Sequence, residues 1–239
     1  MLILAIDTSA ATASAALMED DKALASFSVN LRLEHSRRIL TMIDEVIKLS
    51  EKKISDVDLL CVSNGPGSFT GLRIGVSTVK GLGFVKDTPC SGVSTLEALA
   101  ENLSDASEEI VICPVMDARR DEFYNALFIK KGSLVERLTD DRAISYDELF
   151  KELEETYHDK KIIVNGDGTE KFFALAEKGG RRTENIFSAS ENTKYQNALS
   201  VARVGKRMHE NNQSCTPDKL MPEYIRMSQA ERMSKEQGK

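Results

Sequence analysis

The chain has 239 residues, of which 41% are hydrophobic and 29% are charged, and its formal net charge is −6. This composition is typical of a globular protein with room for one large domain or two small ones. The negative charge argues against a protein that grips nucleic acid by itself, and no apolar run approaches the length that spans a membrane. The four cysteines show no C-x-x-C spacing, so we expect reduced thiols and a cytoplasmic location.

The first part of the chain is predicted to form three strands and a helix. Short apolar runs with tight polar connections, typical of an antiparallel meander, occupy residues 2–6, 12–17 and 23–29. Residues 34–53 lack glycine and proline and are rich in helix-forming side chains, so we expect a long helix there.

Three polar residues, Asp7, Thr8 and Ser9, follow the first predicted strand. A carboxylate beside two hydroxyl groups could hold a metal ion or orient a water molecule. The same residue types are also common in ordinary turns. Both interpretations stay open.

The most distinctive stretch is Asn64-Gly-Pro-Gly-Ser-Phe-Thr-Gly-Leu-Arg-Ile-Gly75. An apolar run at 57–62 precedes it and predicts a buried strand, while residues 70–86 predict a helix. A turn between a strand and a helix N-terminus points backbone N–H groups at an anion.

Gly65, Gly67 and Ser68 are therefore candidate anion- or nucleotide-binding residues, together with the polar turn at 7–9. The spacing matches neither the phosphate loop nor the dinucleotide fingerprint. Glycines also allow close approach of another backbone. An anion cradle and a packing device both remain open.

The second half is predicted to repeat the order of the first. After a strand at 89–93 and a short helix, we expect strands at 110–116, 122–129, 133–138 and 161–164, and helices at 145–155, 169–178 and 194–210. Strand-strand-strand-helix-strand-helix then occurs twice, which predicts a duplicated α/β architecture with a mixed sheet in each half. We expect an N-terminal subdomain at 1–105, a C-terminal subdomain at 106–215 and a tail at 216–239.

The charged stretch at 117–122 could bind an anion or form a salt-bridge cluster. The turn at 165–168 could make a second phosphate contact or be only a turn.

His35 lies at the start of the first predicted helix. A helical metal pair needs a second histidine four residues later, and that position is Ile39. We therefore predict no metal site, and no catalytic constellation is visible from spacing.

Several motifs occur in the order seen in one bacterial family. They are Asp7-Thr-Ser9, His35-Ser36, the glycine stretch at 65–75, Met116-Asp-Ala-Arg119, and Pro222-Glu-Tyr-Ile-Arg226. The chain resembles the TsaB (YeaZ) family over nearly its whole length. The resemblance implies the fold of the actin, Hsp70 and sugar-kinase superfamily, with two ribonuclease-H-like subdomains.

The resemblance also implies a role in making threonylcarbamoyladenosine in tRNA. The expected partners are a TsaD-like catalytic paralogue, which transfers threonylcarbamoyl to N6 of the adenosine next to the anticodon, and a TsaE-like ATPase. The paralogue has a His-x-x-x-His metal motif whose second position is Ile39 here, so this chain is expected to be a catalytically silent scaffold. We expect no intrinsic cofactor, ATP or ADP only at the interface with partners, and tRNA contact only through them.

Helical geometry predicts a docking face on the helices at 34–53 and 70–86. Their apolar arcs are wider than the stripe of about 100° that one core needs. The candidate residues are His35, Arg38, Ile39, Met42, Ile43, Val46, Leu49, Leu72, Arg73, Val76, Val79 and Lys80. The resemblance points to the same helices for a homodimer and, in competition, the heterodimer; Met42→Asp or Val76→Arg is then expected to leave the monomer folded. The alternative is that a loop or the C-terminal tail covers this surface.

Three other functions have weaker support in the sequence. An ATP-binding kinase or ATPase of the same superfamily is the main alternative, but the turn at 7–9 lacks the glycine usual in the first phosphate loop of that superfamily. A metallopeptidase would need the missing histidine. An RNA-binding module is disfavoured by the acidic charge.

Overall fold

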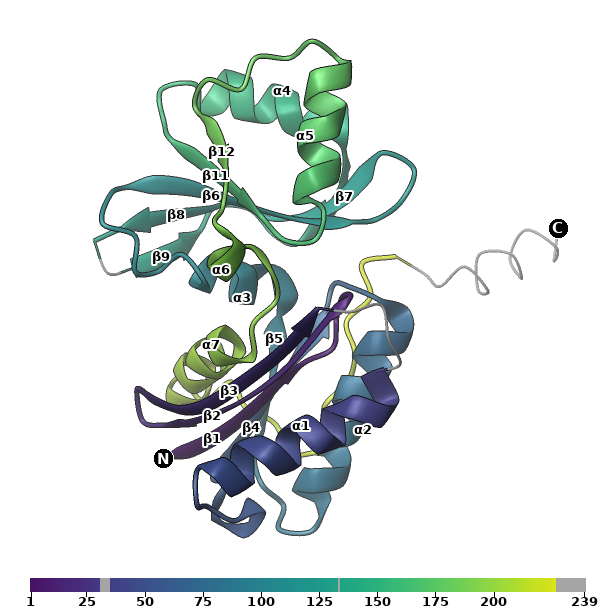
Figure 1. Ribbon diagram of the computed structural model, residues 1–239, viewed down its shortest axis with the longest axis vertical. Helices are drawn as coiled ribbons and strands as arrows, with labels where there is room; N and C mark the ends of the chain where they lie inside the picture. The colour runs from purple at the N-terminus through teal and green to yellow at the C-terminus, as the bar shows by residue number, and fades with distance from the viewer. Residues whose placement is uncertain (31–34, 133, 227–239) are drawn as a thin grey trace, which may run out of the picture.

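Two α/β units are stacked along the long axis of the molecule (Figure 1). The computed structural model describes residues 1–30, 35–132 and 134–226. The first unit contains strands β1 (Leu2–Asp7), β2 (Thr12–Glu19), β3 (Lys22–Asn30), β4 (Leu59–Gly65) and β5 (Cys90–Ser94), and helices α1 (His35–Leu49), α2 (Phe69–Phe84) and α3 (Thr95–Glu101). A 3-10 turn at Ile54–Asp56 follows α1.

The second unit begins after α3. Its strands are β6 (Ile110–Asp117), β7 (Glu122–Asn125), β8 (Phe128–Lys131), β9 (Leu134–Arg137), β10 (Arg142–Ser145), β11 (Ile162–Asn165) and β12 (Ile186–Ser188). Its helices are α4 (Tyr146–Thr156), α5 (Thr169–Lys178), α6 (Glu191–Lys194) and α7 (Ala198–Glu210).

The two sheets have the same topology, which confirms the predicted duplication. The strand order is β3-β2-β1-β4-β5 in one and β10-β7-β6-β11-β12 in the other. In each sheet the first two pairs are antiparallel and the last two are parallel.

The strand predicted at 133–138 is present as β9, but it does not take the third place in the main order of the second sheet. It forms a hairpin with β8 beside the main order, and the third strand is β10. The strand expected at 122–129 is broken after Asn125, because the chain turns there so that β7 and β8 pair with different parts of β6.

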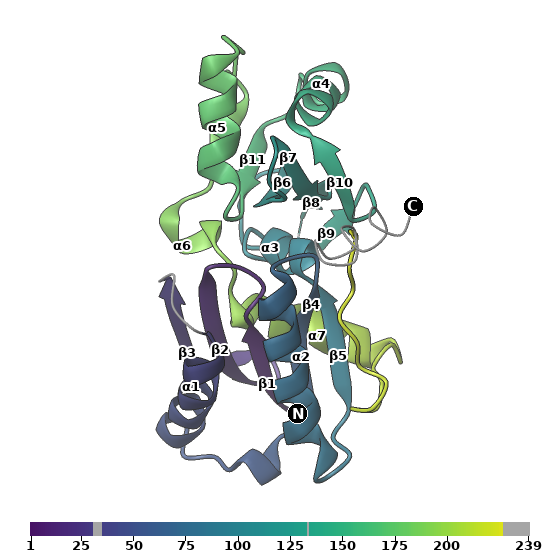
Figure 2. The same ribbon diagram turned by 90° about the vertical axis from the view of Figure 1, so that its right-hand side faces the viewer.

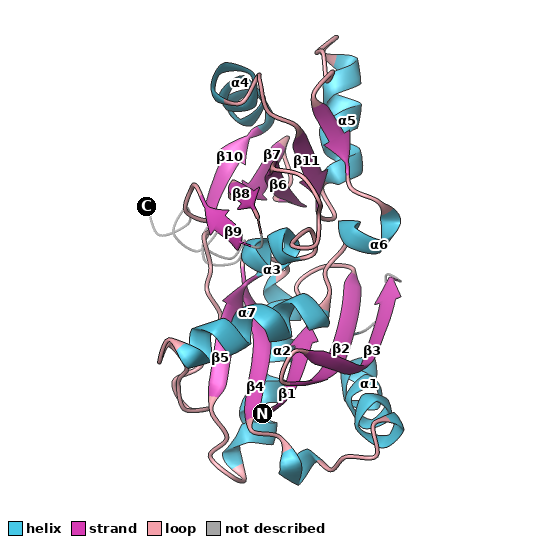
Figure 3. Ribbon diagram, turned by 90° about the vertical axis from the view of Figure 1, so that its left-hand side faces the viewer, coloured by secondary structure: helices cyan, strands magenta, loops and turns pink. Residues whose placement is uncertain are grey.

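Helices cover both faces of each sheet. On the first sheet α1 and α2 lie side by side on one face (Figure 2), and α7 crosses the other (Figure 3). On the second sheet α4 and α5 pack on one face, and α3 packs against β6 on the other. Within the described ranges, no helix has the length and apolar content that a membrane span requires.

The final helix of each half thus packs on the sheet of the other half. Buried residues of α7, including Val201 and Val204, share one core cluster with Ile3 and Met18 of the first sheet. The boundary expected at residue 105 therefore does not coincide with the division between the two packed layers. The helix α7 lies within the range 106–215 but packs on the first sheet.

Candidate docking surface

The turn between β4 and α2 packs against the loop that follows β1. The Ser68 backbone N–H donates to the Ser9 carbonyl at 2.7 Å, and the Thr8 hydroxyl donates to the Gly71 carbonyl at 2.7 Å. A Cβ on Gly71 would lie 2.0 Å from the Thr8 carbonyl oxygen. Of the two interpretations of the glycine stretch, this geometry supports the packing device.

Asp7, Thr8 and Ser9 are fully buried. The Asp7 carboxylate accepts hydrogen bonds from the Ser9 backbone N–H at 2.8 Å, from the Ser9 hydroxyl at 2.7 Å and from the Ser63 hydroxyl. These bonds hold the β1 loop in place, as expected for turn chemistry.

A second carboxylate, Asp167, belongs to the turn at 165–168 that the sequence analysis named as a possible phosphate contact, and its charge interacts with that of Asp7 in this loop. The pKa of Asp167 is raised from 3.8 to about 6, mainly by burial and to a smaller extent by the charges of Asp117 and Asp7, while a hydrogen bond from the Gln196 amide opposes the shift. Asp7 and Asp167 come from different units, so their proximity depends on how the units are joined.

The charged hairpin at 117–122 forms ion pairs. Lys171 binds Asp117 at 2.7 Å, and Arg226 binds Glu122. Among the described residues, no group of three or more His, Cys, Asp or Glu side chains could hold a metal ion. Ile39 is 1% exposed in the core beneath α1; the side chain of His35 lies outside the described residues.

The predicted docking face is wrong for most of its apolar members. Seven of the named residues are buried in the chain's own core: Ile39, Met42, Ile43, Val46, Leu72, Val76 and Val79. The apolar arcs of α1 and α2 are wide because each helix buries side chains against the other helix as well as against the first sheet. Met42→Asp and Val76→Arg would therefore place a charge in the monomer core and unfold it.

A different part of the same helices is open to solvent. Leu40 and Leu49 on α1 are 57% and 64% exposed, and Arg38 and Arg73 are exposed as well. Lys80 on α2 is half-buried. The outer surface of α1 and α2 is the candidate docking surface that remains.

Residues 215–226, which we call the strap, border this surface. Cys215 and Cys90 exchange two backbone hydrogen bonds of 2.8 Å, so the strap begins as a short addition to the edge of β5. The Glu223 N–H then donates to the Asn64 carbonyl at 2.7 Å. A Cβ on Gly65 would lie 2.0 Å from the Glu223 carbonyl oxygen, so this glycine lets the strap approach the turn.

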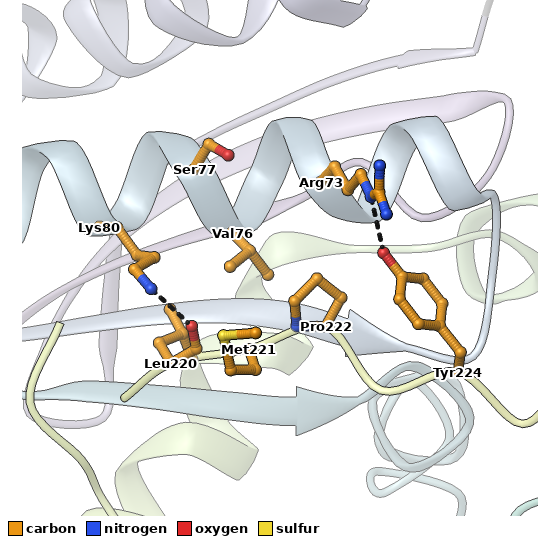
Figure 4. Close-up of a pocket in the computed structure, with 8 residues that line it drawn as sticks. All are labelled: Arg73, Val76, Ser77, Lys80, Leu220, Met221, Pro222 and Tyr224. Carbon is orange, nitrogen blue, oxygen red and sulfur yellow. Dashed lines mark hydrogen bonds between the residues drawn. The ribbon is translucent and has the colours of Figure 1, made fainter. Parts of the chain in front are cut away.

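Between α2 and the strap lies a cavity of about 260 Å³ (Figure 4). The Arg73 Nε donates to the Tyr224 hydroxyl at 3.0 Å near one end. The Lys80 ammonium donates to the Asp218 and Leu220 carbonyls, at 2.9 and 3.1 Å, near the other. The alternative that the C-terminal tail covers part of the helical surface is thus correct for this side of α2.

Two sheets that share the order of their five main strands, each with helices on both faces, form a duplicated mixed α/β fold. Two Pseudomonas aeruginosa crystal structures share the fold: a protein described as similar to peptidase YeaZ, and YeaZ itself. The first has a TM-score of 0.80 at 22% identity over 94% of this chain and 99% of that one. The second has a TM-score of 0.78 at 21% identity, with 93% and 99% covered.

Sequence relatives are more specific. A family model described as TsaD, tRNA N6-adenosine threonylcarbamoyltransferase, matches residues 30–232. The tRNA threonylcarbamoyladenosine biosynthesis protein TsaB of Bacillus subtilis is 31% identical over 97% of this chain and 96% of its own length. Escherichia coli TsaB is 38% identical over 52% of this chain and 53% of its own. The chain belongs to the TsaB family of tRNA threonylcarbamoyladenosine biosynthesis.

Proposed function

We propose that this protein is a non-catalytic subunit that binds a TsaD-type threonylcarbamoyltransferase and enables it to modify N6 of the adenosine next to the anticodon of tRNA. The observation that carries the proposal is the match to a TsaB protein along almost the full length of both chains. The transferase would perform the chemistry, and a TsaE-type ATPase would join the pair. The tRNA would be contacted only through these partners, and a nucleotide would bind only at an interface with them.

The position of Ile39 supports catalytic silence. The paralogous transferase family carries a metal-binding histidine there, whereas this side chain is apolar and packs into the core. A single remaining imidazole gives a weak metal site.

The exposed surface of α1 and α2 is the proposed contact with the transferase. Leu40 and Leu49 are exposed on opposite edges of α1, because nine positions at about 100° each place them about 180° apart, so each edge of the helix offers a partner one apolar side chain. Without the transferase, the same helices are the candidate surface for a homodimer.

Reconstitution tests the proposal. The chain and the transferase encoded by the same genome are purified, alone and together, and threonylcarbamoyladenosine in tRNA is measured by mass spectrometry. We expect no product from the chain alone, product when both proteins are present, and no gain of activity in Ile39→His. Turnover by the isolated chain that survives a further purification step would overturn the non-catalytic assignment.

Surface variants test the docking site. Leu40→Lys with Leu49→Lys should weaken transferase binding about tenfold or more, because the double variant places a charge on both edges of α1 and therefore on whichever edge makes the apolar contact. Leu134→Lys changes an exposed leucine of β9 in the second unit and is the matched control. Equal binding by the α1 double variant and this control would show that α1 is not part of the contact.

A further inference from the structure

Strand β3 forms an open edge of the first sheet. It comes last in the strand order and, among the described strands, pairs with β2 alone (Figure 3). The register shifts at Leu24, so the regular part of this edge runs over residues 25–30. Alternate residues of such an edge have backbone N–H and C=O groups that point away from the sheet. These groups are available to a further strand.

The other sheet edges of the described chain are short, charged or covered. The strap pairs with β5 at Cys90. The end strands of the second sheet, β10 and β12, have four and three residues, and β9 carries Glu136 and Arg137. By contrast, residues 23–29 of β3 include no charged residue and no proline. Since proteins normally protect a long edge from pairing with other chains, the unprotected edge of β3 indicates a binding surface.

The edge also exposes an aromatic side chain. Successive side chains of a strand alternate between its faces, so Phe27 shares a face with Ala25 and Val29. Those two residues pack against the core beneath α1, whereas Phe27 is 39% exposed. Ser26 and Ser28 are exposed on the opposite face. A strand that paired with β3 would bring its own side chains against the Phe27 ring.

The sequence of this edge reads nearly the same in both directions. Phe27 lies between Ser26 and Ser28, and outside these serines lie the apolar residues Ala25 and Val29. In an antiparallel pair of two such strands centred on Phe27, serine faces serine and alanine faces valine. The two aromatic rings meet at the centre, and no charge faces a like charge. The edge is therefore complementary to itself, as a twofold contact requires.

We propose that β3 binds β3 of a second copy of this chain, in an antiparallel pair centred on Phe27. The contact joins two five-stranded sheets into one, and open sheets of about ten strands are stable. The edge of β3 is separate from the outer surface of α1 and α2, which stays open to the transferase. This self-contact goes beyond the proposed function and does not depend on it.

Opposite charges test both the partner and the register. One variant of the full chain combines Ser26→Lys with Ser28→Lys, and a second combines Ser26→Glu with Ser28→Glu. In either variant alone, like charges face each other across the contact, so sedimentation velocity should show a Kd for self-association raised about tenfold or more. A mixture of the two variants should associate as the wild type does, because each lysine then faces a glutamate.

A cross-link tests the centre of the pair. Opposed residues of an antiparallel pair have Cα atoms about 4.5–5.5 Å apart, within the range that a disulfide spans. Phe27→Cys should therefore form a covalent dimer on oxidation. The controls are Ser107→Cys, which should not, and Ser107→Lys, which adds a charge at an exposed position of the second unit and should self-associate within about twofold of the wild type. Melting temperatures show whether each variant remains folded.

The outcomes separate this contact from the proposed function. If the folded lysine and glutamate variants each self-associate as the wild type does, or if their mixture fails to recover association, the β3 contact is wrong. Loss of transferase binding in both variants would assign the edge to the transferase and overturn the assignment to a second copy. Transferase binding equal to that of the wild type, together with weakened self-association, supports the β3 contact as a separate surface.

Discussion

Gly71 has no Cβ, and the Cβ of any other residue at this position would clash with the backbone of Thr8. In Gly71→Ala the new Cβ would lie 2.0 Å from the Thr8 carbonyl oxygen, and the Thr8 hydroxyl fixes that segment by its bond to residue 71. We expect unfolding free energy to fall by about 1–3 kcal/mol, measured by urea unfolding.

Gly81→Ala is the matched control in the same helix. A Cβ there meets nothing within 4 Å, so the gain in helix propensity should stabilise the protein by up to about 1 kcal/mol. Destabilisation of both variants by the same amount would mean that the contact with Thr8 is not the cause.

Asp167 should make stability depend on pH. Burial raises its pKa from 3.8 to about 6 in the folded protein, so the folded state binds a proton more tightly than the unfolded state does. This contribution is fully present below pH 3.8 and is lost as the pH rises through 6. Asp167→Asn keeps an acceptor for the Gln196 amide but has no proton to lose, so its stability does not fall as the pH rises. It should therefore be more stable than the wild type at about pH 7.5 by about 1–3 kcal/mol.

Thermal melts of the wild type and Asp167→Asn across pH 4–8 measure this effect. The difference between them should grow with pH up to about 7 and then level off. The exposed Asp159→Asn is the control for loss of one negative charge. If the melting temperature of Asp167→Asn exceeded that of the wild type by the same amount at every pH, ionisation of Asp167 would not be the cause.

The attachment of the strap to β5 can be trapped covalently. Directly opposed residues in an antiparallel pair have Cα atoms about 5.5 Å apart, within the range that a disulfide spans. Oxidised glutathione should therefore join Cys90 to Cys215, with loss of two hydrogens in the intact mass. Burial raises the pKa of Cys90 to about 12 and also raises that of Cys215, so the reaction should be faster at alkaline pH.

Cys215→Ser should show no loss of mass under the same conditions. Peptide mapping would contradict the pairing of Cys90 with Cys215 if the cross-link joined Cys61 or Cys113 instead.

Elements with a strong local pattern were predictable, and those defined by distant contacts were not. The meander, α1, α2 and the capped helix α4 follow from periodicity and turn residues. β10 has four residues and two apolar side chains, and only its pairing with β7 makes it a strand. The helical wheel of α1 overestimated its open surface because a wheel does not show that a second helix packs beside it.

For the whole molecule, the duplicated architecture was predictable from the repeated order of elements, whereas the cavity between α2 and the strap was not. The cavity joins α2 to residues 220–224, in a segment that the sequence analysis described only as a tail that could cover the helical surface. Asp167 was named only as part of the turn at 165–168, because Asp7, whose charge raises its pKa, is brought near it only by the stacking of the units.

The exchange of α3 and α7 between the halves has a consequence for biosynthesis. One face of the first sheet, including Ile3, Ala5 and Met18, is covered by α7, whose last residue is Glu210. A ribosome adds about 5–20 residues per second, so this apolar face of the sheet remains exposed to solvent for many seconds after β5 has been synthesised. During translation the nascent chain therefore needs a chaperone or a temporary cover for this face, and the unit that is synthesised first is completed last.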